Sequence, residues 1–340
     1  METIKNIKKN SIILLLITLI VLFLVLKDSA SEIFVTLSKI NIFYLLIAIL
    51  LYFLYIISKA YIIYKCVDEK DKLSFKEAIK HNIITQFFNG ITPFSTGGQP
   101  MEVYMIAEHK IKVSKATSVT IENCIFYQTA LVIYGAIAVT CNWIFDLFPK
   151  VAILQHLVLL GFIINILVAV ALYAIMLSKN VTKKVSKFII KVLGKVKTIK
   201  NIDKVESSWI EKLEEFHYIS KNLLHRKGIF ILGVVINLIS LTCLYIIPLF
   251  IMYGLHDFTS LTPMSAIVSS AYVLLMGSFV PIPGASGGIE YGFIKFFGNF
   301  MPVVLLNSLL LTWRFITYYL GMILGGVLFS TEKKGEEKCA

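Results

Sequence analysis

Four ionisable residues, Glu102, Glu122, Glu290 and Arg314, lie in or directly beside long apolar stretches of the sequence. A guanidinium in such surroundings can hold a phosphate through two parallel N–H donors, and a carboxylate can hold an amine. For Arg314 the competing interpretation is a structural ion pair, most simply with Glu290. For Glu102 and Glu122 it is a carboxylate at the end of a helix. Glu290 is therefore the strongest candidate for a binding role.

A repeated motif, Pro-x-x-[Ser/Thr]-Gly-Gly, precedes two of these carboxylates and occurs at residues 93–98 and 283–288. Proline and glycine interrupt helices, and matched interruptions in two halves of a chain point to the substrate site of a transporter. A helix that starts after Gly-Gly also offers free N–H groups to a phosphate. Two unrelated helix kinks are the competing interpretation. The residues predicted to bind substrate are Pro283, Ser286, Gly287, Gly288, Glu290, Arg314, Thr96, Gly97, Gly98, Glu102 and Glu122.

The composition identifies a membrane protein with several helical spans. Of the 340 residues, 57% are hydrophobic and 16% are charged, and the mean hydropathy is +0.79, a balance foreign to soluble domains. The net charge of +12 fits Lys and Arg gathered in cytoplasmic loops, and no basic–aromatic nucleic-acid module is recognisable. The five scattered cysteines predict neither a disulfide framework nor a metal site. Nucleotide-loop and hydrolase motifs are also absent, so we expect no cofactor.

The apolar segments predict an all-α polytopic fold with about six full spans and two re-entrant, broken-helix hairpins. The hairpins are the charge-free segment 82–101, broken at 90–100, and the segment 258–300, broken at 280–291. Broken backbone at membrane depth is tolerated where it is buried in protein or lines a wet cavity. The six spans are expected at about residues 11–26, 40–64, 121–145, 151–178, 228–256 and 303–330.

The distribution of basic residues predicts the orientation. Lysines flank the first hairpin on both sides, and residues 179–227 carry thirteen Lys or Arg against five Asp or Glu. By the positive-inside rule these regions and both termini are cytoplasmic. The first hairpin then enters from the cytoplasm and the second from outside, as in an inverted repeat. The predicted units are a first membrane half (1–178), a basic linker with an amphipathic helix (179–227), a second membrane half (228–331) and a tail (332–340).

Three motifs carry a resemblance to a known family. The segments Gly90–Pro100, Pro281–Glu290 and Arg314–Gly321 resemble the motifs of the transmembrane (flippase) region of lysylphosphatidylglycerol synthase, over nearly the whole chain. The resemblance implies a bacterial cytoplasmic-membrane protein that moves aminoacylated phospholipid from the inner to the outer leaflet, in a system that confers resistance to cationic peptides. The aminoacyltransferase domain of the bifunctional members does not follow the last span, so a stand-alone member is expected.

We therefore expect translocation of an aminoacylated or zwitterionic phospholipid such as lysylphosphatidylglycerol. One alternative is a membrane enzyme, meaning the phosphatidylglycerol lysyltransferase or a subunit of that system. Another is a secondary transporter of a small polar solute. The expected partner is membrane phospholipid and not nucleic acid, and a separate aminoacyl-lipid synthase and a second copy of the chain are further candidates. The energy source is open between passive exchange and ion coupling.

Overall fold

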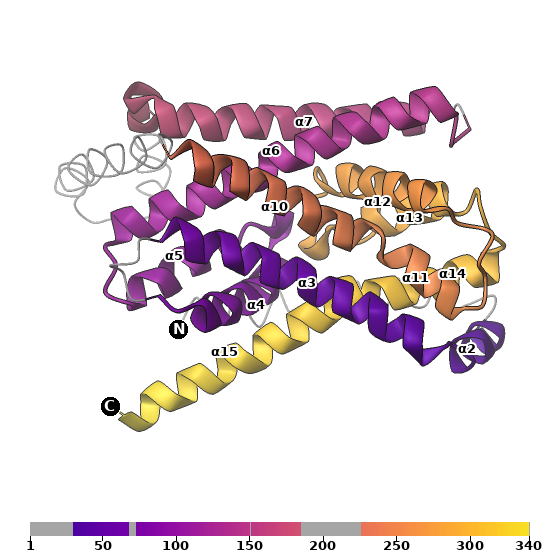
Figure 1. Cartoon of the computed structure of the whole chain (residues 1–340), viewed down its shortest axis with the longest axis horizontal. Helices are drawn as coiled ribbons and strands as arrows, with labels where there is room; N and C mark the ends of the chain where they lie inside the picture. The colour runs from indigo at the N-terminus through magenta and orange to yellow at the C-terminus, as the bar shows by residue number, and fades with distance from the viewer. Residues whose placement is uncertain (1–29, 68–72, 150, 185–225, 340) are drawn as a thin grey trace.

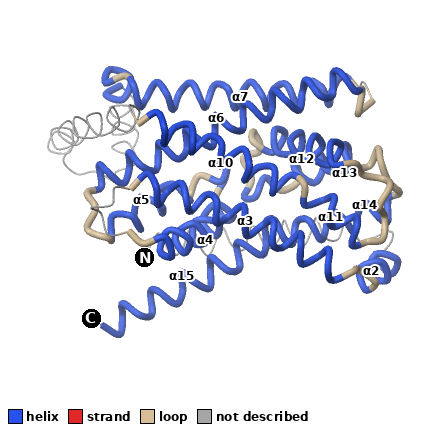
Figure 2. The backbone as a smooth tube through the Cα atoms, viewed as in Figure 1, coloured by secondary structure: helices blue, strands red, loops and turns tan. Residues whose placement is uncertain are grey.

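The structure, a computed structural model, describes residues 30–67, 73–149, 151–184 and 226–339. Throughout these ranges the regular elements are helices and no strand occurs (Figure 2). The helices long and apolar enough to cross a membrane are Ile42–Cys66, Val113–Phe145, Ile153–Leu177, Lys227–Gly254 and Val303–Glu332. The predicted all-α polytopic membrane fold is confirmed. The predicted span at 11–26 and most of the basic linker, with its amphipathic helix, lie outside the described residues.

The spanning helices follow the expected boundaries with two differences. Helix α6 begins at Val113 instead of residue 121. The hydroxyls of Thr117 and Ser118 bond to carbonyls one turn earlier, at 2.7 and 3.0 Å, so the polar side chains of these first turns are compatible with a helix. The fifth span is broken near Pro248, which has no N–H to continue the ladder. The helices outside the two predicted hairpins are α2 (Ala30–Ser38), α3 (Ile42–Cys66), α6 (Val113–Phe145), α7 (Ala152–Leu177), α10 (Lys227–Tyr245), α11 (Ile247–Gly254), α14 (Val303–Arg314) and α15 (Leu320–Cys339).

Two broken hairpins pack against these helices. The first consists of α4 (Phe75–Ile91), the short turn η1 (Pro93–Ser95) and α5 (Gly98–Glu108). The second consists of α12 (Pro263–Gly277), the turn η2 (Pro283–Ala285) and α13 (Gly288–Phe297). In Figure 1 α4 and α5 lie toward one end of the bundle and α12 and α13 toward the other. The two breaks meet, because η1 packs against η2.

Contacts at the two ends of the bundle agree with this arrangement. At one end the Asn41 N–H donates to the Gly254 carbonyl at 2.8 Å, which joins the start of α3 to the end of α11. At the other end Lys80 of α4 forms an ion pair with Glu332 of α15. The C-terminus therefore lies at the end of the bundle from which the first hairpin enters (Figure 1).

Aromatic packing fixes the second hairpin against the last span. Phe293 of α13 stacks on Phe297 with a centroid distance of 4.2 Å and lies 4.8 Å from the ring of Trp313 on α14. Large buried rings of this kind contribute about 0.5–1.5 kcal/mol per pair beyond the area that they bury. The next residue after Trp313 is Arg314, so this packing sets the distance between Arg314 and α13.

Candidate functional site

The two breaks share a backbone conformation over their first four residues, 92–95 and 282–285, and then diverge: Thr96 is αR but Ser286 is extended, and φ is −76° at Gly97 but 88° at Gly287. Thr92 and Ile282, which precede the prolines, are extended, with φ, ψ of −114°, 145° and −108°, 144°, as expected before proline. The next two positions after each proline are left-handed: φ is 53° and 53° at residues 94–95, and 64° and 49° at residues 284–285. Three of these four residues are not glycine, so the conformation is costly and is held by the surrounding fold. The agreement at residues 92–95 and 282–285 supports the interpretation of the motifs as a repeat, although the two Gly-Gly ends differ.

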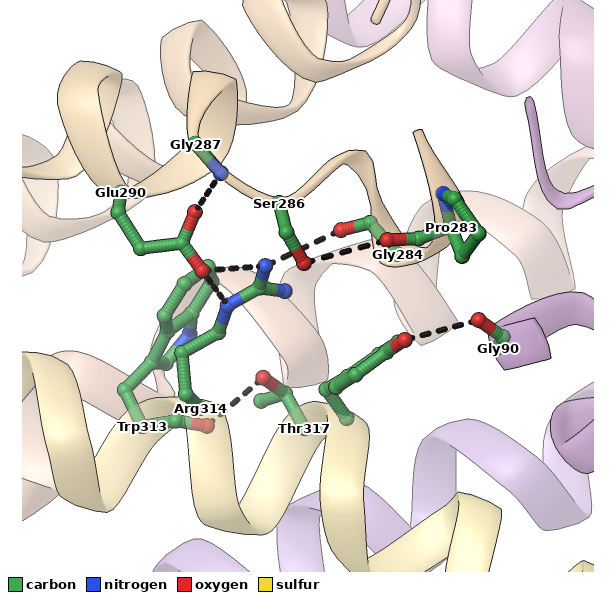
Figure 3. A network of polar contacts seen from close by, with 10 residues as sticks. Gly90, Pro283, Gly284, Ser286, Gly287, Glu290, Trp313, Arg314 and Thr317 are labelled. Atoms are coloured by element: carbon green, nitrogen blue, oxygen red, sulfur yellow. Dashed lines mark hydrogen bonds and ion pairs between the residues drawn. The ribbon is translucent and has the colours of Figure 1, made fainter. Parts of the chain in front are cut away.

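A buried ion pair closes the second break. The Arg314 Nε donates to Glu290 Oε1 at 2.7 Å and its Nη2 lies 2.5 Å from the same oxygen. The other carboxylate oxygen accepts the Gly287 N–H at 2.6 Å, and the Arg314 Nη2 also donates to the Gly284 carbonyl at 3.1 Å (Figure 3). Glu290 and Arg314 are each 6% exposed. The carboxylate therefore caps α13 and joins it to the last span.

Tyr318 links this ion pair to the first hairpin. Its hydroxyl donates to the Gly90 carbonyl at 2.8 Å, across 228 residues of sequence, and its ring lies 4.9 Å from the Arg314 guanidinium carbon. Tyr318 belongs to η3 (Phe315–Tyr319), a π-helical turn that follows Arg314 directly. A π-turn rotates the side chains after it relative to an α-helix and is common at functional sites. A Cβ at Gly284 would lie 2.4 Å from the Tyr318 hydroxyl, so the close approach requires glycine there.

At the first break, side chains occupy the helix N-terminus. The Gly97 N–H donates to Thr92 Oγ1 at 2.8 Å, and the Gly98 N–H donates to Asn89 Oδ1 at 2.9 Å. With Gly287 bonded to Glu290, the N–H groups of Gly97, Gly98 and Gly287 are all satisfied within the chain. A phosphate at either helix end would displace one of these side chains.

The predicted site residues divide into three sets. Pro283, Ser286, Gly287, Gly288, Glu290 and Arg314 gather at the second break, where the Ser286 hydroxyl donates to the Pro283 carbonyl at 3.1 Å. Thr96, Gly97 and Gly98 belong to the first break, which packs against the second.

Glu102 and Glu122 form the third set and do not join the Glu290 network. Glu102 accepts from Asn123 Nδ2 of α6 at 3.5 Å, and Glu122 interacts with Cys66 of α3. In the described ranges no group of three or more His, Cys, Asp or Glu residues lies close enough to hold a metal ion.

Two further residues with functional groups inside the bundle were not predicted from the sequence. Lys59 lies within the apolar span α3, and its ammonium is 4.7 Å from the ring centre of Tyr127 and 3.5 Å from the Tyr55 hydroxyl. The sequence does contain a signal for Lys59, because it is a charged residue within the 25 residues of the apolar helix α3. Tyr318 is the other residue, and the available signals were its position one turn after Arg314 and its place within the motif Arg314–Gly321.

A comparison with known protein families identifies the family of this chain. The model of the lysylphosphatidylglycerol synthase TM region matches residues 11–325. The chain belongs to this family. It is also 25% identical over 264 residues to a UPF0104 membrane protein of Archaeoglobus fulgidus, across 75% of this chain and 76% of that protein. The family match covers both hairpins and Arg314, so the site lies inside the family's shared region, in agreement with the resemblance of the motifs.

Proposed function

We propose that this protein moves a phospholipid with a zwitterionic or aminoacylated headgroup between the leaflets of the cytoplasmic membrane. The observation that carries the proposal is a buried ion pair at the meeting point of two broken hairpins that enter from opposite ends of the bundle. Charged groups at membrane depth are costly and occur where polar cargo passes. The family, named for a lysylphosphatidylglycerol synthase, supports a lipid as that cargo.

The ion pair favours a headgroup that carries both signs of charge. A phosphate can take the place of Glu290 on Arg314 while an amine of the same headgroup takes the place of Arg314 on Glu290. All charges then remain paired. A headgroup with a phosphate alone would leave Glu290 buried without a cation, at a cost of about 3–5 kcal/mol. Lysylphosphatidylglycerol meets this requirement and unmodified phosphatidylglycerol does not.

Residues of both breaks are exposed beside the buried pair. In the first break, Pro93, Phe94, Ser95 and Thr96 are exposed although they lie between two helices of a membrane hairpin. In the second, Gly287 is exposed, and a Cβ there would meet no atom within 4 Å. A headgroup can therefore approach the Gly287 backbone directly, and to bind there it has to displace Glu290 from the Gly287 N–H or from Arg314.

The charge distribution gives the orientation of the bundle, and the resemblance to the family gives the direction of transport. The end of the bundle with the first hairpin carries Lys76, Lys80 and Lys110, and the opposite end is nearly neutral. We assign the basic end to the cytoplasm. With the precedent of the family, transport then runs from the inner to the outer leaflet.

The test uses purified protein reconstituted in vesicles. Lysylated and unmodified phosphatidylglycerol, each labelled, are followed with a reagent that reads one leaflet. We expect the lysylated lipid to move at least about tenfold faster, since tenfold corresponds to only about 1.4 kcal/mol. Equal or faster movement of the unmodified lipid would count against the headgroup assignment.

Variants locate the site in the same assay. Glu290→Gln and Arg314→Ala should each abolish translocation, while Glu332→Gln, which removes the ion pair with Lys80 of α4, should not. Normal translocation by both site variants would show that the site is elsewhere. Formation of lysyl-lipid from charged tRNA in cells that express this chain alone would favour the enzyme, and uptake of a soluble solute such as lysine would favour a solute transporter.

A further inference from the structure

Glu102 is a second intramembrane carboxylate, but its surroundings differ from those of Glu290. It lies on the first turns of α5, directly after the first break, and is 7% exposed. Glu290 receives a backbone N–H and the guanidinium within 2.7 Å. Glu102 instead receives the amide of Asn123 at 3.5 Å, which is long for a hydrogen bond, and faces the Thr120 hydroxyl. An ionised carboxylate held away from water needs stronger partners than these.

Asn123 supplies an independent observation. Its side chain is 6% exposed, and its Oδ1 has no hydrogen-bond partner within the described part of the chain. Buried amide oxygens are rarely left in this state. A proton on Glu102 corrects both defects. The carboxylic acid donates its O–H to Asn123 Oδ1, while its other oxygen accepts from Asn123 Nδ2. The two side chains then form a two-point acid–amide pair.

Lys59 of α3 is a candidate partner for the ionised form of Glu102. Lys59 attracts Glu102 electrostatically, but its ammonium lies against the rings of Tyr55 and Tyr127, at 5.3 and 4.7 Å from the ring centres. Cation–π contacts with neutral phenols hold an ammonium without neutralising it. A lysine side chain is a flexible four-carbon stem, and a change of its rotamer is the movement that an exchange of Lys59 between the tyrosines and Glu102 requires.

The remaining titratable groups around Glu102 do not replace Lys59. Cys66 of α3 and Cys124 of α6 also lie near Glu102 and bring no positive charge to it. Cys66 is buried and interacts with Glu122 and Arg226, and Cys124 is half-buried.

On α4, which packs against α5, the titratable groups lie at the outer end of the helix. Glu77 and His81 are beside His109, and Lys80 is bonded to Glu332. Lys59 is thus the cation placed to exchange with a proton on Glu102.

We propose that Glu102 is a proton-binding site that couples proton movement to translocation. In the protonated state Glu102 pairs with Asn123 and Lys59 remains on the tyrosines. When the carboxyl group releases its proton, Lys59 takes the place of that proton. Because Glu102 lies on the helix that begins at Gly98, the exchange shifts the first break against the second. The proton-binding part stands on the geometry alone, and the coupling part rests on the proposed function.

Infrared difference spectra of the full chain in lipid, recorded between low and high pH, test proton binding without any transport. We expect a protonated-carboxyl band that is lost as the pH rises, absent in Glu102→Gln and retained in Glu108→Gln, a matched change at an exposed residue of the same helix. Lys59→Met should move the midpoint of the loss to higher pH, because removal of the cation favours the neutral acid. A structural role for Glu102 would leave that midpoint unchanged. A wild-type spectrum without the band, or an unchanged band in Glu102→Gln, would overturn the proposal.

A pH gradient across the vesicle membrane tests the coupling. The measured quantity is the ratio of the lipid translocation rate with the gradient to the rate without it. We expect a ratio that departs from one for the wild type and for Glu108→Gln, and a ratio of one for Glu102→Gln. An equal response of Glu102→Gln and the wild type would refute the coupling. If the wild type moves no lipid at all, the proposed function fails, and the infrared titration still decides whether Glu102 binds a proton.

Discussion

Arg314 and Glu290 are bound so closely that neither side chain can be changed without consequences for the other. The carboxylate accepts three donors and the guanidinium donates to two residues, all inside the bundle. Loss of one partner from a buried ion pair usually costs more than loss of both. Stability measurements on single and double variants therefore show how much of this network is structural.

We expect Arg314→Ala to lower the free energy of unfolding by about 3–5 kcal/mol, because Glu290 is left buried and unpaired. The double variant Glu290→Gln/Arg314→Ala should be more stable than Arg314→Ala, since it contains no unpaired charge. Denaturant or thermal unfolding of the purified protein in detergent gives the comparison. Glu332→Gln is the matched control at a partly exposed ion pair, where about 0–1 kcal/mol is expected. A double variant less stable than Arg314→Ala would show that the unpaired Glu290 carboxylate is not the cause of the loss of stability in Arg314→Ala.

Tyr318→Phe isolates the link between the two breaks. The variant keeps the ring beside Arg314 and removes the hydroxyl that bonds to the Gly90 carbonyl at 2.8 Å. We expect a loss of about 1–3 kcal/mol, because the carbonyl loses its partner inside the bundle. Tyr291→Phe, at an exposed ring on α13, should change stability by less than about 0.5 kcal/mol. Equal stabilities of the two variants would mean that water or a neighbour replaces the Tyr318 hydroxyl.

At the scale of the elements, the start of α5 depends on a side chain from α4. Asn89 Oδ1 accepts the Gly98 N–H at 2.9 Å, so an α4 residue acts as the cap of the next helix across the break. We expect Asn89→Ala to cost about 1 kcal/mol and to raise the hydrogen-exchange rate of the Gly98 amide. Asn89→Asp keeps the acceptor oxygen and should leave the hydrogen-exchange rate of the Gly98 amide low. Similar hydrogen-exchange rates of this amide in the two variants would show that residue 89 does not cap α5.

Much of the element order could be predicted from the sequence because proline and glycine act locally. Pro93 and Pro283 each fix the preceding residue as extended, so both breaks are recognisable from the residue types alone. The early start of α6 at Val113 is not recognisable from the residue types. Its first turns contain polar side chains, such as Thr117, which resemble a polar loop in a hydropathy profile. The tertiary contact from Tyr318 to Gly90 leaves no pattern in the sequence.

The candidate site was predictable in part for a similar reason. Glu290 and Arg314 stand out as charges within apolar segments, and an ion pair between them was one of the two interpretations of Arg314. The sequence could not show that Glu102 lies apart from them, since it follows the same Gly-Gly motif. Its neighbours come from α6 and α3, at Asn123 and Lys59, which only the packing of the helices brings together.

On the scale of the whole molecule, the two hairpins and the long helices define two ends of the bundle (Figure 1). Both legs of the first hairpin and the end of α15 lie at one end, in agreement with the ion pair between Lys80 and Glu332. The start of α3 and the end of α11 lie at the other, joined by the bond from Asn41 to Gly254. Because the bundle spans a membrane, residues at these two ends must face opposite aqueous phases.

This arrangement gives a direct test by cysteine labelling. In a variant with all five native cysteines replaced by alanine, single cysteines are introduced at Lys110 and Thr331 for the first end and at Lys39 and Thr259 for the second, all of them exposed. We expect an impermeant maleimide added to right-side-out vesicles to label Lys39→Cys and Thr259→Cys only, since the basic end is assigned to the cytoplasm. Permeabilised vesicles should label all four and serve as the control. Labelling of both Lys110→Cys and Thr259→Cys from outside would mean that the two hairpins do not enter from opposite faces of the membrane. An inverted repeat would then not explain why the two breaks meet.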